Sequence, residues 1–238
     1  MNTSELKKFA QWARRTLIEQ AGARVSSVLE AGSAERREFP TAVLALEREI
    51  RNSSEAQVVE RAAYIWFNRL SALMFMDANG YTAVRAVSPS EGQTRPALLS
   101  DAMAGHIDDA IPAKVRERVL AILNRSAPSR EPEAEAYRLL LVAVCNQWHD
   151  VMPFMFEKIA DWTELLMPVD LLSSDSILTN MRAVMTEDAC QDVEIIGWLY
   201  QFYISEKKDQ VFAGLKKNVK ITAENIPAAT QLFTPHWI

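Results

Sequence analysis

Apolar residues recur at helical spacing from the start of the chain. Between residues 4 and 30 an apolar side chain falls at every third or fourth position: Leu6, Phe9, Ala13, Leu17, Ala21, Val25 and Val28. This spacing places all of them on one face of a helix. The pattern therefore predicts a long first helix over residues 4–30, with Asn2, Thr3 or Ser4 available to cap it.

Two further helices are predicted next. Residues 31–37 are polar and interrupt the pattern, and Pro40 then suits the first turn of a helix that runs to Asn52. Ser54 begins the third helix with a possible capping box, Ser54-Glu55-Ala56-Gln57. This helix is apolar over most of its circumference, which is typical of a central helix. Asn79-Gly80 ends it, because both residues tolerate the left-handed conformation of a C-cap.

The remaining chain predicts more helices and little else. Helical patterns cover residues 96–104, 113–125, 133–148, 154–166, 176–185, 193–205 and 210–217, and several of the breaks between them contain proline. Residues 81–87 are of β type and could form one short strand. We therefore expect a mainly α fold with at most one short β element near residues 81–87. The low glycine content, 7 residues in 238, agrees with this.

Charge is distributed unevenly along the chain. The formal net charge is −5, which argues against a dedicated nucleic-acid-binding module. Residues 101–200 carry 17 acidic and 8 basic residues, a net of −9, whereas residues 206–220 carry 5 lysines and 2 acids, a net of +3. Residues 1–40 have a net of +2, from 7 basic and 5 acidic residues. Any DNA contact would thus come from the two ends, although charge runs of this kind are more often solvated helix faces.

Few residues suggest chemistry on their own. The three histidines, His106, His149 and His236, lack a second ligand at helical spacing, so no metal site is expected. His149 is interpreted as a structural residue at a helix end. Cys145 lies in an apolar helical run, where a buried, inert thiol is expected. No closely spaced glycines could cradle a phosphate. With no signal peptide and no apolar run of membrane-spanning length, we expect a cytoplasmic protein with reduced thiols and no membrane contact.

Two aromatic segments carry a resemblance to a known family. The first is Ala63-Tyr64-Ile65-Trp66-Phe67-Asn68-Arg69-Leu70, followed by Met74-Phe75-Met76-Asp77-Ala78-Asn79-Gly80-Tyr81. The second runs from Val193 to Ile204 and on into Lys207-Lys208-Asp209. Both resemble the beginning of BREX-type phage-defence methyltransferases, the PglX family, and of related single-chain restriction-modification enzymes. Helix-core packing accounts for the same aromatic residues and does not compete with this resemblance.

The resemblance implies an adenine-specific DNA methyltransferase that uses S-adenosylmethionine. The tail from Ala229 to Ile238 is similar to the start of the family's methyltransferase domain, where a Thr-Pro helps to enclose the cofactor. On that basis Phe233, Thr234 and Pro235 are expected to be cofactor-adjacent. The family's Asp-Pro-x-Cys-Gly-Ser/Thr-Gly and Asn-Pro-Pro-Tyr/Phe motifs are missing from the chain. No catalytic residue is carried over, and we expect the chain alone to be inactive and to bind no cofactor.

The acidic, cysteine-containing link near residues 186–192 suggests a domain boundary, and the resemblance implies a set of partners. We expect a helical N-terminal domain over residues 1–186, a helical connector over 187–226 and the start of the methyltransferase domain over 227–238. Expected partners are DNA, other BREX subunits and a phage inhibitor that mimics DNA. The candidate phosphate contacts are the basic residues of the two ends: Lys207, Lys208, Lys216, Lys217, Lys220, Arg14, Arg15, Arg36 and Arg37. The alternative is a helical protein-interaction module without DNA contact or catalysis.

Overall fold

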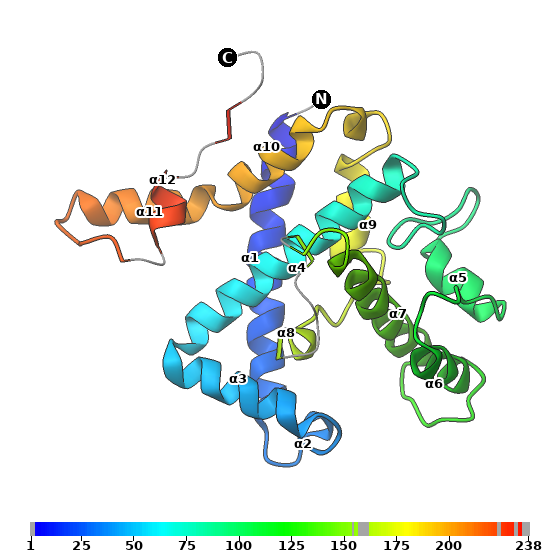
Figure 1. The fold of residues 1–238 in the computed structure, drawn as a ribbon. Coiled ribbons are helices and arrows are strands. Elements are labelled where there is room, and N and C mark those ends of the chain that lie inside the picture. Colours follow the sequence, from blue (N-terminus) through cyan, green and yellow to red (C-terminus); the bar gives the residue numbers. More distant parts are fainter. Residues whose placement is uncertain (1–2, 154, 157–161, 223–224, 231–232, 235–238) are drawn as a thin grey trace.

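The computed structural model describes residues 3–153, 155–156, 162–222, 225–230 and 233–234, and that part of the chain is almost entirely helical (Figure 1). The helices are α1 (Thr3–Leu29), α2 (Ala34–Glu38), α3 (Pro40–Asn52), α4 (Glu55–Ala78), α5 (Ala97–Met103), α6 (Ala113–Leu123), α7 (Pro132–His149), α8 (Trp162–Leu165), α9 (Ile177–Val184), the 3₁₀ helix η1 (Ala189–Gln191), α10 (Glu194–Tyr203), α11 (Ser205–Leu215) and α12 (Ile226–Thr230). The predicted mainly α fold is confirmed. None of the described helices is long and apolar enough to cross a membrane.

Helix α1 is the long central helix of the fold, and α4 and α10 pack across it (Figure 1). The apolar stripe predicted from the sequence, from Leu6 to Val28, is buried along its full length. The N-terminal half of α1 joins α4, α7, α9 and α10 in the main hydrophobic core. The C-terminal half, with Ala21, Val25 and Val28, joins α3, the start of α4 and α8 in a smaller cluster. Since both clusters share α1 and α4, these two helices organise the whole fold.

Helix α4 begins and ends where the sequence predicts. The Ser54 side chain accepts a hydrogen bond from the Gln57 N–H at 3.3 Å, as an N-cap does. At the other end Gly80 has φ +66°. The Tyr81 N–H donates to the Met76 backbone carbonyl, and the Gly80 N–H donates to the Asp77 backbone carbonyl. This hydrogen-bond pair is a Schellman motif, which needs a residue that tolerates positive φ. Pro40 likewise stands at the first position of α3, as expected.

Residues 81–87 form a loop and not the short strand that their composition suggested. Isolated β pairing in the described chain is limited to one bridge, between Pro89 and Pro96. The loop folds around the carboxylate of Asp77, which accepts backbone N–H groups of Ala86, Val87 and Ser88 at 2.8–2.9 Å. The Thr82 hydroxyl donates to the same carboxylate at 3.0 Å. A side chain therefore satisfies the N–H groups that a neighbouring strand would otherwise have paired.

Three other predicted boundaries differ from the structure. The polar stretch 31–37 contains a short helix, α2, which the Ser33 side chain caps. The last basic helix begins at Ser205 rather than at residue 210, so it follows α10 almost directly. The helix predicted over 154–166 falls partly outside the described residues, and its described part is helical only over α8.

The fold predicts a large cost for removing the Asp77 carboxylate. Asp77 is fully buried, and burial raises the pKa of its carboxyl, although its four hydrogen bonds oppose that shift. Asp77→Ala leaves three buried backbone donors without an acceptor, so we expect a loss of about 2–4 kcal/mol in the free energy of unfolding. Urea denaturation would measure it. Asp188→Ala, at an exposed aspartate, is the control and should change stability by less than about 0.5 kcal/mol. Equal effects of the two substitutions would contradict this role of Asp77.

Candidate nucleic-acid interface

The two aromatic segments that carry the family resemblance pack against each other. Phe67 of α4 stacks on Tyr203 of α10, with ring centroids 4.3 Å apart. Tyr64, one turn earlier on α4, contacts Tyr200 and Tyr203 with centroids 6.1 and 5.9 Å away. Aromatic pairs at these distances add to the stabilisation from burial alone. The contact helps to hold α10, which also packs along α1, and the basic helix α11 begins directly after α10.

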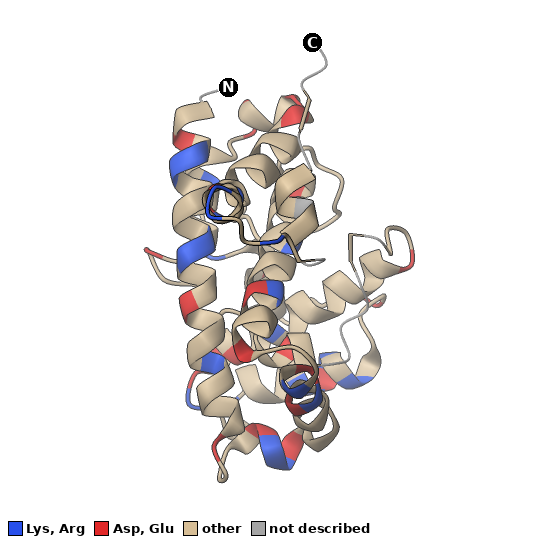
Figure 2. Ribbon diagram, turned by 90° about the vertical axis from the view of Figure 1, so that its left-hand side faces the viewer, with Lys and Arg blue, Asp and Glu red and all other residues tan. Residues whose placement is uncertain are grey.

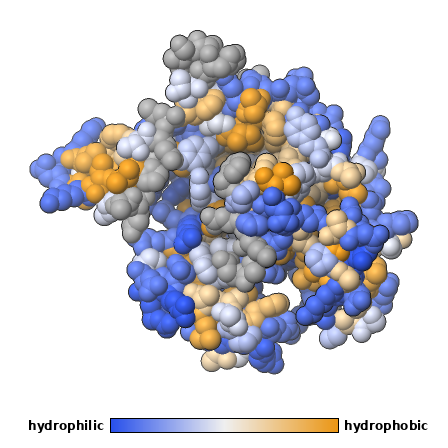
Figure 3. Space-filling view, viewed as in Figure 1, coloured by the Kyte–Doolittle hydropathy of each residue, from blue (hydrophilic) through white to orange (hydrophobic). Residues whose placement is uncertain are grey.

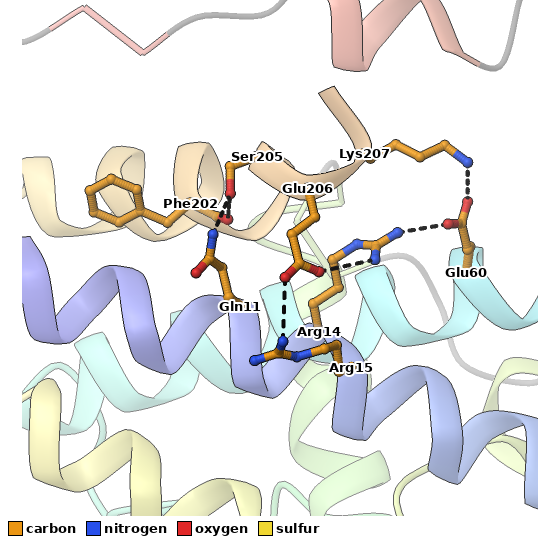
Figure 4. Close-up of polar contacts among 8 residues, drawn as sticks. All are labelled: Gln11, Arg14, Arg15, Glu60, Phe202, Ser205, Glu206 and Lys207. Atoms are coloured by element: carbon orange, nitrogen blue, oxygen red, sulfur yellow. Dashed lines mark hydrogen bonds and ion pairs between the residues drawn. The ribbon is translucent and has the colours of Figure 1, made fainter. Parts of the chain in front are cut away.

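A cluster of charged side chains then attaches the start of α11 to α1 and α4 (Figure 4). We call it the charge cluster, and its members are Arg14, Arg15, Glu60, Glu206 and Lys207. Arg14 pairs with Glu60 at 2.7 Å and with Glu206 at 3.8 Å. Arg15 pairs with Glu206 at 3.6 Å, and Lys207 pairs with Glu60 at 2.8 Å. The two chain ends that are basic in sequence are therefore joined through two carboxylates.

The charge cluster is nearly neutral, which changes the role expected of its cations. Three cations and two carboxylates leave a net charge of +1. The Arg14 side chain is only 10% exposed, so its guanidinium is committed to Glu60 and Glu206. Removing either carboxylate would leave a partly buried charge less well compensated, which is costly. Arg15, with a side chain 65% exposed, remains accessible to an external phosphate.

The other lysines of this region lie beyond the charge cluster, on an arm formed by α11 and the turn that follows it. Lys216, Lys217 and Lys220 are exposed there, and Lys208 lies 6.0 Å from the ring centroid of Phe212. Asn218, at φ 60°, ends α11 in a Schellman motif in which the Val219 N–H donates to the Gly214 carbonyl at 3.0 Å. Lysines next to a helix C-terminus are favoured by the helix dipole. The local fold thus presents several cations together at the tip of the arm.

Arg36 and Arg37 lie far from this arm. Arg36 donates to the carbonyls of Leu29 and Glu30 and pairs with Glu47 at 2.8 Å, so it closes the C-terminal end of α1. At 1.5 Å per residue, the helix from residue 14 to residue 29 separates the two ends by about 22 Å. Arg37 is exposed at this distant end. Figure 2 shows basic residues spaced along α1, with α11 pointing toward the viewer beside it.

Phe233 docks on α10. Its ring lies 5.3 Å from that of Trp198 in an edge-on arrangement, and its N–H donates to Gln201 Oε1 at 3.0 Å. A Cβ added at Gly197 would lie 2.2 Å from the Phe233 ring, so only glycine permits this approach. Thr234 is exposed, and Pro235 lies outside the described residues. Of the three residues expected beside a cofactor, Phe233 is therefore held by contacts within this chain.

The remaining candidates have structural surroundings. Cys145 is fully buried, and burial raises the pKa of its thiol to about 12, which confirms the expected inert thiol. His149 Nδ1 donates to the Phe156 carbonyl at 2.8 Å, so this histidine holds the chain that leaves α7. Among the described residues no group of three or more His, Cys, Asp or Glu side chains could hold a metal ion.

Sequence reasoning missed the two carboxylates of the charge cluster. Glu206 stands directly before Lys207, but counting net charge treated it only as a reduction of the local positive charge. Glu60 lies in a different helix and gave no signal, because its pairing with Arg14 and Lys207 depends on how the helices cross.

The chain is similar to two adenine-specific methyltransferases. It is 35% identical over 262 aligned residues to the adenine-specific methyltransferase BrxX of Escherichia coli O9:H4 (strain HS), an alignment that covers 100% of this chain and 21% of that protein. It is 35% identical over 189 residues to the adenine-specific methyltransferase PglX of Lacticaseibacillus casei (strain Zhang), covering 76% of this chain and 15% of that protein. The chain thus spans about a fifth or less of the length of these relatives. No protein-family model matches it.

The contact between Phe233 and α10 predicts that substituting Gly197 stabilises α10 but weakens the docking of Phe233 on it. Gly197→Ala favours helix α10, because alanine is a better helix former than glycine by about 1 kcal/mol. The added methyl group displaces the Phe233 ring, so we expect the Phe233 amide to lose protection from hydrogen exchange while the thermal midpoint is unchanged or rises. Gly22→Ala is the matched control, since nothing lies near its Cβ position. Retained protection of Phe233 in Gly197→Ala would contradict the docking.

Proposed function

Because the chain is homologous to BREX adenine-specific methyltransferases, we propose that it is the helical N-terminal region of a DNA adenine-N6 methyltransferase. The observation that carries this proposal is an alignment over the whole chain at 35% identity. The parent enzyme would transfer a methyl group from S-adenosylmethionine to adenine in a specific DNA sequence and would act in the cytoplasm. The chain contains neither the cofactor motif nor the catalytic motif of that family. No catalytic step is therefore assigned to its residues.

The region would support the catalytic part of the enzyme through the arm. Figure 3 shows apolar surface on the arm, bordered by hydrophilic residues. Phe212, Leu215, Val219 and Ile221 are 38–59% exposed there, and Ile226 of α12 is 50% exposed. Several exposed apolar side chains close together are typical of an interface that is covered in the complete protein. Phe233 and Thr234, next along the chain, would then enter the catalytic domain near the cofactor, as the resemblance implies.

DNA contact would involve accessible cations of the arm and of the neighbouring charge cluster. These are Arg15, Lys208, Lys216, Lys217 and Lys220. The exposure of all of these except the half-buried Lys208 supports phosphate contact, whereas the pairing of Arg14, Arg36 and Lys207 with carboxylates favours a structural role for those three. Phosphate contacts of this kind position a protein on DNA and carry no sequence information directly.

The first test removes the region from its gene. DNA of cells that carry the intact gene should contain N6-methyladenine at a fixed sequence, which single-molecule sequencing detects. In-frame deletion of codons 2–220 should abolish the mark, because the catalytic part loses its support. The Asp188→Ala gene is the control and should methylate normally. Absence of the mark with the intact gene would contradict the activity, and persistence after the deletion would contradict the supporting role.

The second test concerns DNA contact by the arm. The logarithm of a DNA-binding constant falls with the logarithm of salt concentration by about 0.9 for each phosphate contact. The triple substitution Lys216→Ala, Lys217→Ala and Lys220→Ala should therefore reduce the slope by about 2 to 3. Fluorescence anisotropy with a labelled duplex at several salt concentrations would measure this.

The control removes three exposed cations from other surfaces. Arg48→Ala, Lys114→Ala and Arg130→Ala change the net charge of the chain by the same amount. This variant should keep a slope close to that of the unmodified protein. Equal slopes for the two triple variants would show that the arm does not contact phosphates and would favour the protein-interaction alternative.

A further inference from the structure

We propose that a pocket beside the C-terminal end of α7 binds an arginine of a partner protein, together with the apolar residues that flank it. The pocket has a volume of about 340 Å³ and lies between the loop that follows α4, helix α5, residues 106–111 and the end of α7. It is separate from the arm and from the charge cluster, and neither the activity nor the DNA contact proposed above uses it.

The pocket has apolar walls and an aromatic lining. Leu98, Ile111 and Val144 line it, together with the Trp148 side chain. Tyr81 and Val151 also line it, and they are 63% and 66% exposed. Exposed apolar side chains around a hollow of this kind are unfavourable in water and are typical of a binding site. The volume is near the lower end of the range for ligand pockets, about 300–1,000 Å³, and it suits one large side chain rather than a whole helix.

One residue of the pocket wall has a buried donor without an acceptor. The amide nitrogen Nε2 of Gln147 is shielded from solvent and makes no hydrogen bond within the described residues. A buried polar group without a partner costs about 1–3 kcal/mol, unless a ligand or a water molecule satisfies it. Because Gln147 belongs to the wall of the pocket, the resonances of its side-chain amide report on what occupies the pocket.

The charge of the residues that line the pocket favours a cationic ligand. Asp101 and Asp108 line the pocket beside His106, whereas Asp109 pairs with Arg116 outside it. Asp108 accepts the Ala110 N–H at 2.8 Å through Oδ1. A phosphate would be repelled here, whereas a guanidinium would be attracted. The planar guanidinium can pair with a carboxylate and stack on an aromatic ring such as Trp148, which a lysine ammonium does less well. The pocket therefore favours an arginine between apolar residues.

The test follows the Gln147 side-chain amide by NMR. The probe is the peptide acetyl-Leu-Arg-Leu-amide, and the control is acetyl-Leu-Glu-Leu-amide. The arginine peptide should shift the Gln147 Nε2 resonances saturably, with a dissociation constant on the order of 1 mM for so short a ligand. Gln147→Glu identifies these resonances by removing them.

Two variants separate pocket binding from a change in the fold. Asp101→Asn with Asp108→Asn should weaken the arginine peptide by about three- to tenfold, since asparagine keeps the local hydrogen bonds but not the charge. Asp188→Asn, which removes a charge elsewhere, should leave the affinity unchanged. The proposal is overturned if the glutamate peptide binds as tightly as the arginine peptide. It is also overturned if the arginine peptide causes no shift at a concentration 10-fold above the expected dissociation constant, or if the Asp101→Asn/Asp108→Asn variant and the Asp188→Asn variant bind that peptide equally well.

Discussion

The C-terminal segment from α10 onward depends on the packing of α10 across α1 and α4, in which Phe67 stacks on Tyr203. This stacking joins α4 to α10 across a large separation in sequence, and α10 in turn carries α11 on one side and Phe233 on the other. The packing of α10 along α1 and α4 brings Glu206 and Lys207 next to Arg14, Arg15 and Glu60, where the charge cluster forms. The aromatic segments in which the sequence resembles the methyltransferase family thus pack against each other in this chain.

The sequence predicted the parts of the fold that depend on local patterns. The stripe of α1 and the caps at Ser54 and Gly80 require only spacing and the conformational preferences of single residues, and the structure confirms them. Residues 81–87 were expected to favour a strand because β-type side chains dominate there. The N–H groups of Ala86 and Val87 instead donate to the Asp77 carboxylate, a side-chain partner at the end of α4 that the alternation of residue types does not reveal.

The sequence indicated the positions of the basic residues but not their surroundings, for a similar reason. Arg14 and Arg15 do lie beside the start of α11, but net charge does not distinguish a cation held by a carboxylate from one that faces solvent. Arg14 and Arg15 are neighbours in sequence, yet their side chains are 10% and 65% exposed. Which of the two is accessible depends on the orientation of α1 against α4 and α11, and the pocket beside α7 likewise involves four separate segments.

The arm differs from the rest of the molecule in one respect that affects its energetics. Helix α11 buries no side chain fully, and its attachment rests on the charge cluster and on the turn after α10. Segments with so few buried contacts open locally at a small fraction of the global unfolding free energy. The arm should therefore sample opened states while α1 and α4 stay folded. A surface that binds the arm must therefore offset the free-energy cost of ordering it. Such binding is selective for a surface of matching shape and is readily reversible.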